Sequence, residues 1–292
     1  MNKYYKLFFL FFVLNFQICV YGGSKTLVVV LDWFINPNHA PLLVAEQEGF
    51  FAKRGLKIKF ITPADASEGE KMVAANKADI AITYEPMLAL YVSRNIPLKQ
   101  LATLIDRPLN CLIVSKDSNI NSLKDLMGKR IGFSGTDIER IILATMLRKV
   151  NLKLNDIQMI NVKFNLVSAF LSNKIDGFIG GMRNFEPEIF KINGKIIRIF
   201  YPEEFGFPKY SELILVVHKD KIHDPSFIEF ISALKEGIAY LKKYPIESWC
   251  KFREIHPELN NELNRRIWFL TIQYFTNHPE KIDQHKLYIQ RC

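Results

Sequence analysis

From Lys25 onward the chain repeats one pattern: a short apolar run, a turn, and a segment with apolar residues at helical spacing. In the first repeat, "TLVVVLDW" is followed by "PLLVAEQEGFFAKRG", which ends at a glycine as helices commonly do. Buried strands that alternate with helices are typical of α/β folds in which most strands run parallel. A chain of 292 residues can bury two separate cores. We therefore predict an α/β protein with two lobes.

The order of the segments predicts that the chain passes between the lobes more than once. A second series of strands and helices begins at "NCLIVS" and closes at "GFIGG". After it, "SELILVVHKD" has the pattern of a strand that returns to the first lobe, and long amphipathic helices follow.

Two crossings, near residues 109–112 and 205–213, would form a hinge beside a cleft. We assign residues 24–110 and 211–292 to the first lobe and residues 111–210 to the second. Strand ends and helix starts from both lobes meet in such a cleft, and closure can bury a small molecule there. The cleft is therefore the expected ligand site.

Residues 1–23 differ from the rest of the chain. Lys3 and Lys6 precede an apolar stretch, residues 7–16, which is too short to cross a bilayer of about 30 Å as a helix. Small residues follow it, so we expect a signal peptide and a periplasmic location. Cys19 leaves lipoprotein anchoring open, but "FQI" before it lacks the small residue expected there.

Removal of that leader would leave three cysteines in an oxidising compartment, where they cannot all pair within one chain. Cys111 lies in an apolar run and is expected to be a buried thiol. Cys250 and Cys292 could form a bridge that pins the C-terminal tail.

The net charge of +9 does not indicate nucleic-acid binding. The 39 basic residues are interleaved with 30 acidic ones and form no run of five or more. We interpret this charge as solvated surface. The sequence shows no ligand spacing typical of a metal site and no order of residues typical of a Ser/His/Asp or Cys/His catalytic site. We therefore expect neither a metal nor a cofactor.

Seven stretches at the ends of the expected strands form a specific joint pattern over residues 27–275. They are "LDWFINPNHAPLLVAEQEGFFAKRGL", "PADASEG", "ADIAITYEP", "RPLNCLIVSKDSNI", "LKDLMGKRIGFSG", "NVKFNLVSAFLSNKIDGFIGGMRNFE" and "FGFPKYSELILVV". Together they resemble the periplasmic pyrimidine-binding proteins of thiamine-precursor ABC transporters, a branch of the type II solute-binding proteins. The resemblance implies a type II periplasmic binding protein fold. It also implies that a formylaminopyrimidine or hydroxymethylpyrimidine is bound and delivered to a permease in the inner membrane. We expect a monomer.

The same superfamily contains an enzyme that builds the thiamine pyrimidine from one of its own histidines and a pyridoxal phosphate held on a lysine. Thr83 stands at the lysine position and Met87 at the histidine position, and no cysteine-rich run occurs near Leu213. We therefore expect a binding protein and no enzyme. Relatives that carry riboflavin, alkanesulfonates or taurine leave other cargoes open, and a sulfonate site would need basic residues near Ser134 and Thr136.

A diazine ring with an exocyclic amine needs an aromatic face and polar groups that match its edge. Trp33 and Tyr84 follow expected strands and are candidate walls, although they could instead cap the core or bond a loop. In "FIGGMRNFE", Gly181 and the glycine before it would let the backbone approach a ligand closely. Glu186 could accept from an amine, and Asn184 could both donate and accept. A plain turn is the competing interpretation of this stretch.

Other candidates lie where helices are expected to begin. Asn36 and His39 belong to "INPNHAP", in which we expect Asn38 to cap the helix. Ser134 and Thr136, in "FSGTDIE", would present hydroxyl and N–H groups that favour anionic or carbonyl oxygens. Ser134 and Thr136 could each instead serve only as a helix cap, and His39 could hydrogen-bond the loop instead of the ligand.

Three further candidates complete the predicted site. Asn110 and Asn165 are expected near a crossing and at a strand end, and Tyr210 lies beside the second crossing. Tyr210 and the neighbouring Glu212 could latch the closed state or only close the hinge turn.

Overall fold

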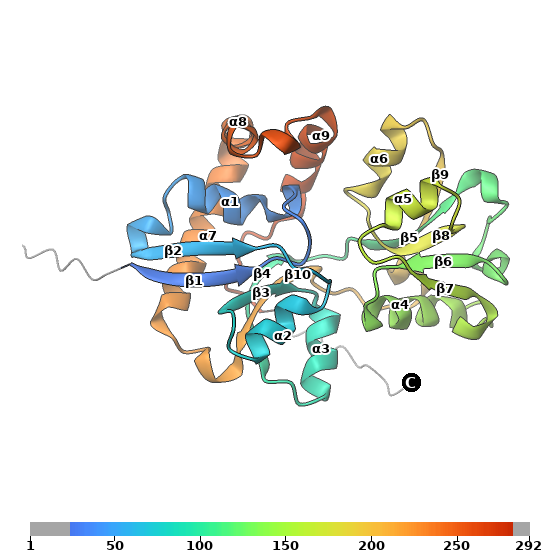
Figure 1. The fold of residues 1–292 in the computed structure, drawn as a ribbon, viewed down its shortest axis with the longest axis horizontal. Helices are drawn as coiled ribbons and strands as arrows, with labels where there is room; N and C mark the ends of the chain where they lie inside the picture. The colour runs from blue at the N-terminus through green and yellow to red at the C-terminus, as the bar shows by residue number, and fades with distance from the viewer. Residues whose placement is uncertain (1–23, 283–292) are drawn as a thin grey trace, which may run out of the picture.

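The computed structural model describes residues 24–282, which form two five-stranded sheets placed side by side (Figure 1). Helices cover both faces of each sheet (Figure 1). We call each sheet with its helices a lobe. The predicted signal peptide, Cys19 and Cys292 fall outside the described residues, so the leader, the lipid anchor and the Cys250–Cys292 bridge remain predictions.

The first lobe contains the sheet with strand order β2-β1-β3-β10-β4. Its strands are β1 (Lys25–Val30), β2 (Leu56–Ile61), β3 (Ile80–Thr83), β4 (Leu98–Ile105) and β10 (Leu213–His218). Its helices are α1 (Ala40–Gln47), α2 (Glu68–Ala74), α3 (Glu85–Ser93), α7 (Pro225–Lys243), α8 (Pro245–Ile255) and α9 (Glu262–Thr271), with a 3-10 turn, η1 (Pro37–His39), before α1.

The second lobe contains the sheet with strand order β7-β6-β8-β5-β9. Its strands are β5 (Asn110–Ser115), β6 (Arg130–Phe133), β7 (Gln158–Asn161), β8 (Gly177–Met182) and β9 (Ile197–Phe200). Its helices are α4 (Asp137–Arg148), α5 (Leu166–Leu171) and α6 (Glu186–Ile192).

Both sheets are mixed, so the prediction of largely parallel strands is wrong for half of the pairings. Strand β10 runs antiparallel to β3 and β4, and β5 runs antiparallel to β8 and β9. Each of these two strands directly follows a crossing and enters its sheet from the cleft side. It therefore runs away from the cleft, whereas β1, β3, β6 and β8 run toward it. Strands β4 and β9, at the sheet edges, are not singled out by the sequence pattern.

The core of the first lobe depends on close packing between α1 and α7. Gly237 lies in α7 where an added Cβ would sit 2.5 Å from the carbonyl oxygen of Pro41. Glycine therefore lets the two helix backbones approach each other over the buried face of the sheet. Within residues 24–282, no helix has both the length and the apolar character needed to cross a bilayer.

Candidate functional site

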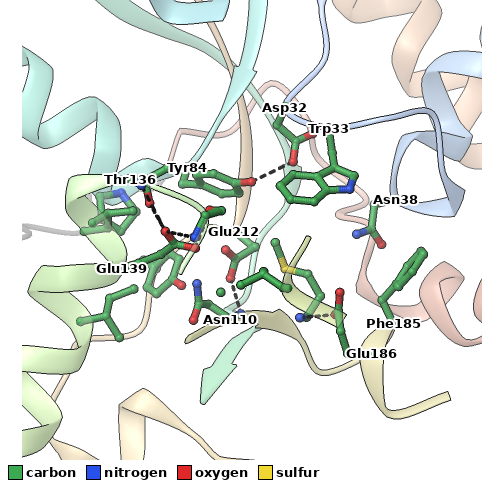
Figure 2. Close-up of a pocket in the computed structure, with 18 of the residues that line it drawn as sticks. Asp32, Trp33, Asn38, Tyr84, Asn110, Thr136, Glu139, Phe185, Glu186 and Glu212 are labelled. Atoms are coloured by element: carbon green, nitrogen blue, oxygen red, sulfur yellow. Dashed lines mark hydrogen bonds between the residues drawn. The ribbon is translucent and has the colours of Figure 1, made fainter. Parts of the chain in front are cut away.

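A cavity lies between the lobes, where the strand ends that face the cleft converge (Figure 2). The first lobe contributes residues after β1 and β3, and the second contributes residues at the start of β5 and α4 and around the end of β8. The two crossings contribute Asn110 and Tyr210, so the cavity touches the hinge itself. A ligand here would contact both lobes and the segments that join them.

A buried polar chain supports the first-lobe side of the cavity. Asp32 follows β1, and its Oδ1 lies 2.8 Å from Nε2 of His39, while its Oδ2 accepts a hydrogen bond of 3.0 Å from the Tyr84 hydroxyl. The Nδ1 of His39 accepts from the backbone N–H of Asn36 at 3.3 Å, so the ring proton lies on Nε2 and is donated to Asp32. Burial raises the pKa of Tyr84 well above its usual value, and the charge of Asp32 raises it further. Tyr84 is therefore a fixed, protonated wall of the cavity.

Aromatic rings join the lobes beside the cavity. The ring of Trp33 lies edge-on to that of Phe164 in the second lobe, with 4.3 Å between ring centroids. Phe34, which is 52% exposed, packs against the same Phe164 ring at 5.2 Å. Trp33 thus lines the cavity and also contacts the opposite lobe, instead of only capping the core of its own lobe.

The carboxylate of Glu139 occupies the start of α4. It accepts hydrogen bonds from the backbone N–H groups of Ser134 and Thr136, at 3.0 and 3.2 Å. It also accepts from both hydroxyls, at 2.6 Å for Ser134 and 2.8 Å for Thr136. The groups that we expected to face a ligand therefore donate to Glu139, and each hydroxyl can offer a ligand only its oxygen lone pairs.

Two further carboxyl groups line the cavity (Figure 2). Glu186, at the start of α6, accepts from the N–H of Met182 at 2.6 Å. Glu212 accepts from the N–H groups of Leu109 and Asn110 at 2.5 and 2.8 Å, so it ties one crossing to the other. Burial raises the pKa of each of these two glutamates to about 7.

The lining is acidic and rich in acceptors. It includes the carboxyl groups of Asp32, Glu139, Glu186 and Glu212, and among residues 24–282 no Lys, Arg or His lines it. The buried Oδ1 of Asn110 has no hydrogen-bond partner within residues 24–282. Such a site suits a ligand that brings N–H or O–H donors and repels an anionic one.

The structure brings eight of the predicted site residues to this one cavity, and their contact with a ligand remains a prediction. They are Trp33, Asn36, Tyr84, Asn110, Ser134, Thr136, Glu186 and Tyr210.

Four predicted residues do not line the cavity. His39 lies behind it, with both ring nitrogens engaged. Asn165 is exposed at the start of α5. Gly181 faces the core, where an added Cβ would lie 2.8 Å from Ile113; the preceding glycine, Gly180, lines the cavity in its place.

Asn184, the fourth, bridges the lobes. Its Nδ2 donates to Oδ1 of Asn38 at 2.7 Å and to Oγ1 of Thr271, in α9, at 2.8 Å. Asn38 also differs from expectation, because it lines the cavity while Asn36 provides the cap: Oδ1 of Asn36 accepts from the N–H of Asn38 at 2.8 Å.

Three acidic residues of the lining were absent from the predicted site: Asp32, Glu139 and Glu212. Two of them carry a signal in the sequence. Asp32 directly follows a buried strand, where polar residues gather in α/β folds, and Glu139 completes the T-x-x-E pattern of a capping box. Glu212 was expected beside the second crossing as a latch or hinge residue, but its place in the lining has no local signal, because its partners lie 102 and 103 residues away along the chain.

Comparison with protein families matches residues 36–248 to the family model described as NMT1/THI5 like. The chain belongs to this family. A similar protein is the putative thiamine biosynthesis protein of Haemophilus influenzae, 37% identical over 274 residues, or 93% of this chain and 87% of that one.

Two other relatives of this NMT1/THI5-like protein have different names. The formylaminopyrimidine-binding protein of Halalkalibacterium halodurans is 27% identical over 226 residues, or 77% of this chain and 68% of that one. The 4-amino-5-hydroxymethyl-2-methylpyrimidine phosphate synthase of Legionella pneumophila is 25% identical over 264 residues, or 89% of this chain and 83% of that one. Similarity within the family therefore extends to binding proteins and to synthases.

The fold is that of a type II periplasmic binding protein, which confirms the predicted fold class. The alkanesulfonate-binding protein SsuA of Xanthomonas axonopodis pv. citri, solved with MOPS bound, matches with a TM-score of 0.69, covering 87% of this chain and 86% of that one. The two sequences are only 14% identical, so this likeness concerns the fold alone. Within the described residues, no group of three or more His, Cys, Asp or Glu side chains could hold a metal ion.

Proposed function

We propose that this protein captures a neutral aminopyrimidine precursor of thiamine, of the formylaminopyrimidine or hydroxymethylpyrimidine type, between its lobes and delivers it to an ABC transporter permease. The supporting observation is one cavity that combines two aromatic side chains, Trp33 and Tyr84, with four carboxyl groups and, within the described residues, no basic side chain. An aminopyrimidine has a π face for the rings and N–H donors for the carboxylates. The name of the H. halodurans relative supports the same ligand class.

Within this proposal each side of the cavity has a part in binding. The pyrimidine ring packs against Trp33, and Tyr84 closes the site beside it. The amine donates to Glu186 from the second lobe, so the ligand joins the two lobes only when they are closed. Oδ1 of Asn110 accepts a second donor of the ligand, which would satisfy a buried acceptor that otherwise costs free energy.

The acidic lining argues against a sulfonate or taurine cargo. A sulfonate-binding site needs basic side chains or free N–H donors. The N–H and hydroxyl groups at the start of α4 already donate to Glu139. Lys163 lines an adjoining hollow that shares Ser134 and Thr136 with the cavity, but Asp65 lines the same hollow.

A synthase activity is the second candidate, because synthase-named relatives cover most of this chain. The position aligned with the cofactor lysine is Thr83, whose hydroxyl donates to the buried carboxyl of Glu70, and Met87 at the histidine position is buried as well. In the part of the chain that the structure describes, no lysine lines the cavity. We therefore expect no visible absorbance of a lysine-bound pyridoxal phosphate after incubation with that cofactor; such a band, lost on substitution of one lysine, would favour the synthase.

The test of the binding function combines two measurements on the purified protein. Ligand released by denaturation would be identified by mass, and thermal unfolding would be followed with formylaminopyrimidine, hydroxymethylpyrimidine, riboflavin, taurine and methanesulfonate. At 100 times Kd a specific ligand stabilises the folded state by about 2.7 kcal/mol. Stabilisation by riboflavin or a sulfonate, with none by either pyrimidine, would refute the assignment.

The remaining elements of the proposal concern the whole protein. We propose that residues 1–23 direct export to the periplasm, that residues 24–110 with 211–292 and residues 111–210 move as the two lobes, and that the monomer docks on its permease. The periplasmic binding protein fold supports this arrangement.

A further inference from the structure

The start of α4 has the form of an anion-binding site that the chain fills with its own carboxylate. Backbone N–H groups at the start of a 12-residue helix, together with two hydroxyls, point at one place, which is the arrangement that binds phosphate and sulfonate groups in many proteins. That place is occupied by the carboxylate of Glu139, which is 4% exposed and accepts four hydrogen bonds.

These contacts go beyond helix capping. A capping box needs only the Thr136 N–H and the reciprocal bond from the Glu139 N–H to the Thr136 hydroxyl. Glu139 takes three more donors, two from Ser134 and one from the Thr136 hydroxyl, and its carboxylate lines the cavity (Figure 2). The charge thus faces the space in which a ligand would lie.

The neighbouring strand β8 is shaped around the same carboxylate. Gly180 has φ +99° and lies so close to Glu139 that an added Cβ would overlap Oε1. Asp32, Glu186 and Glu212 add further carboxyl groups to the lining, and no basic residue among the described ones offsets them. An anionic group entering the cavity would meet an occupied site and four carboxyl groups.

We propose that Glu139 is a specificity-determining residue that excludes phosphorylated and other anionic ligands, so that the cavity accepts the pyrimidine alcohol or amide and rejects its phosphate ester. This inference rests on the proposed function for the pyrimidine part of the ligand. The exclusion of anions does not rest on that function, because the occupied start of α4 would exclude inorganic phosphate or methanesulfonate equally. Loss of the carboxylate would free two N–H and two hydroxyl donors, with Lys163 in the adjoining hollow.

The experiment measures binding of hydroxymethylpyrimidine, its phosphate ester, inorganic phosphate and methanesulfonate by calorimetry to the full mature protein and to two variants. Glu139→Ala removes the carboxylate from the start of α4, and Glu139→Gln keeps the size of the side chain without its charge. We expect the unaltered protein to prefer the alcohol over the ester by at least about 100-fold, and Glu139→Ala to reduce that preference at least about tenfold and to gain measurable phosphate or sulfonate binding. The preference of Glu139→Gln for the alcohol should lie between those of the unaltered protein and Glu139→Ala.

A matched control separates this effect from simple loss of a helix cap. Asp125 makes the same kind of capping box with Ser122, is partly exposed, and lies outside the cavity. Asp125→Ala should lower the melting temperature without changing the ratio of alcohol to ester affinity. The proposal is overturned if the unaltered protein binds the ester as tightly as the alcohol, or if both folded Glu139 variants keep its preference and bind neither bare anion. If no pyrimidine binds at all while Glu139→Ala gains anion binding, the pyrimidine function fails and the exclusion by Glu139 stands.

Discussion

At the scale of single residues, Glu186 and Trp33 carry the proposed recognition from opposite lobes. Glu186→Ala and Trp33→Ala should each weaken pyrimidine binding at least about tenfold, or about 1.4 kcal/mol, because one removes the acceptor for the amine and the other removes the stacking face. Titration calorimetry with the purified protein measures this directly. Asn193→Ala, at the exposed end of the same helix α6 and outside the cavity, is the control and should bind normally. Unchanged affinity in both site variants would remove these residues from the site.

The buried carboxyl groups also predict a pH dependence of stability. Burial raises the pKa of Glu70, Glu186 and Glu212 from 4.5 to about 7 in the folded protein. Between these values the folded state binds more protons than the unfolded state, so the free energy of unfolding falls as pH rises from about 5 to 8. Each group contributes up to about 3 kcal/mol to this loss. Carboxyls with a lowered pKa, such as Asp224 at about 2, change their contribution only below this range.

Urea unfolding of the ligand-free protein at pH 5, 6, 7 and 8 measures how the free energy of unfolding changes with pH. Glu186→Gln cannot titrate and should flatten part of this pH dependence. A stability that rises steadily over this pH range would contradict the raised pKa values.

The residue scale also shows why the sequence locates part of the site and not the rest. Trp33, Tyr84 and Glu186 stand within a few residues of the ends of apolar runs, so their place near the cleft follows from local pattern. His39 was misassigned because a turn, η1, brings it back onto Asp32 seven residues earlier. Glu212 was missed as a lining residue because its partners come from the other crossing.

At the scale of elements, strand β8 combines a regular strand with an irregular end at the cavity. Gly180 has a positive φ and faces Glu139, so Gly180→Ala would strain the backbone and push the carboxylate off the start of α4. We expect it to destabilise the protein by about 1–3 kcal/mol and to weaken ligand binding. Gly194→Ala is the control for the backbone term alone, because it too has positive φ but has open space around it. Equal effects of the two substitutions, measured by urea unfolding and calorimetry, would contradict the role of the Glu139 contact.

The same scale explains how far the fold was predictable. Strands β1, β3 and β6 are read from their apolar runs, and α1 and α4 from their spacing and caps. The direction of β5 and β10 depends instead on the side from which the chain enters each sheet, and this is a property of the crossings and not of the strand residues. The edge strands β4 and β9, "LKQLATLI" and "IRIF", are flanked by turn residues, but β4 does not alternate strictly and β9 has only four residues, so the pattern does not single them out.

At the scale of the whole molecule, polar and aromatic contacts hold the lobes together on several sides of the cavity. Asn184 bonds Asn38 and Thr271, Arg94 of the first lobe pairs with Asp137 of the second at 2.9 Å, and Trp33 packs on Phe164. The Asn184 bonds are buried, whereas the Arg94 pair is exposed and contributes little. Asn184 is therefore the contact most suited to hold the closed arrangement.

Asn184→Ala should shift the protein toward an open arrangement, because it leaves the buried Oδ1 of Asn38 without its donor. We expect a larger radius of gyration by small-angle X-ray scattering and ligand release at least about tenfold faster, with a smaller change in the association rate. Asn193→Ala, exposed and bonded only within α6 and its end, serves as the control. Release rates that match those of the unaltered protein would show that the bridge does not hold the lobes.

Strand β10 lies between β3 and β4, although it is made more than a hundred residues after either of them. Strands β5–β9 form one uninterrupted stretch, so during synthesis or export the later half can assemble while β3 and β4 still have unpaired edges. The beginning of the chain is thus the last part to be completed, and a product truncated before residue 213 would expose these edges to aggregation.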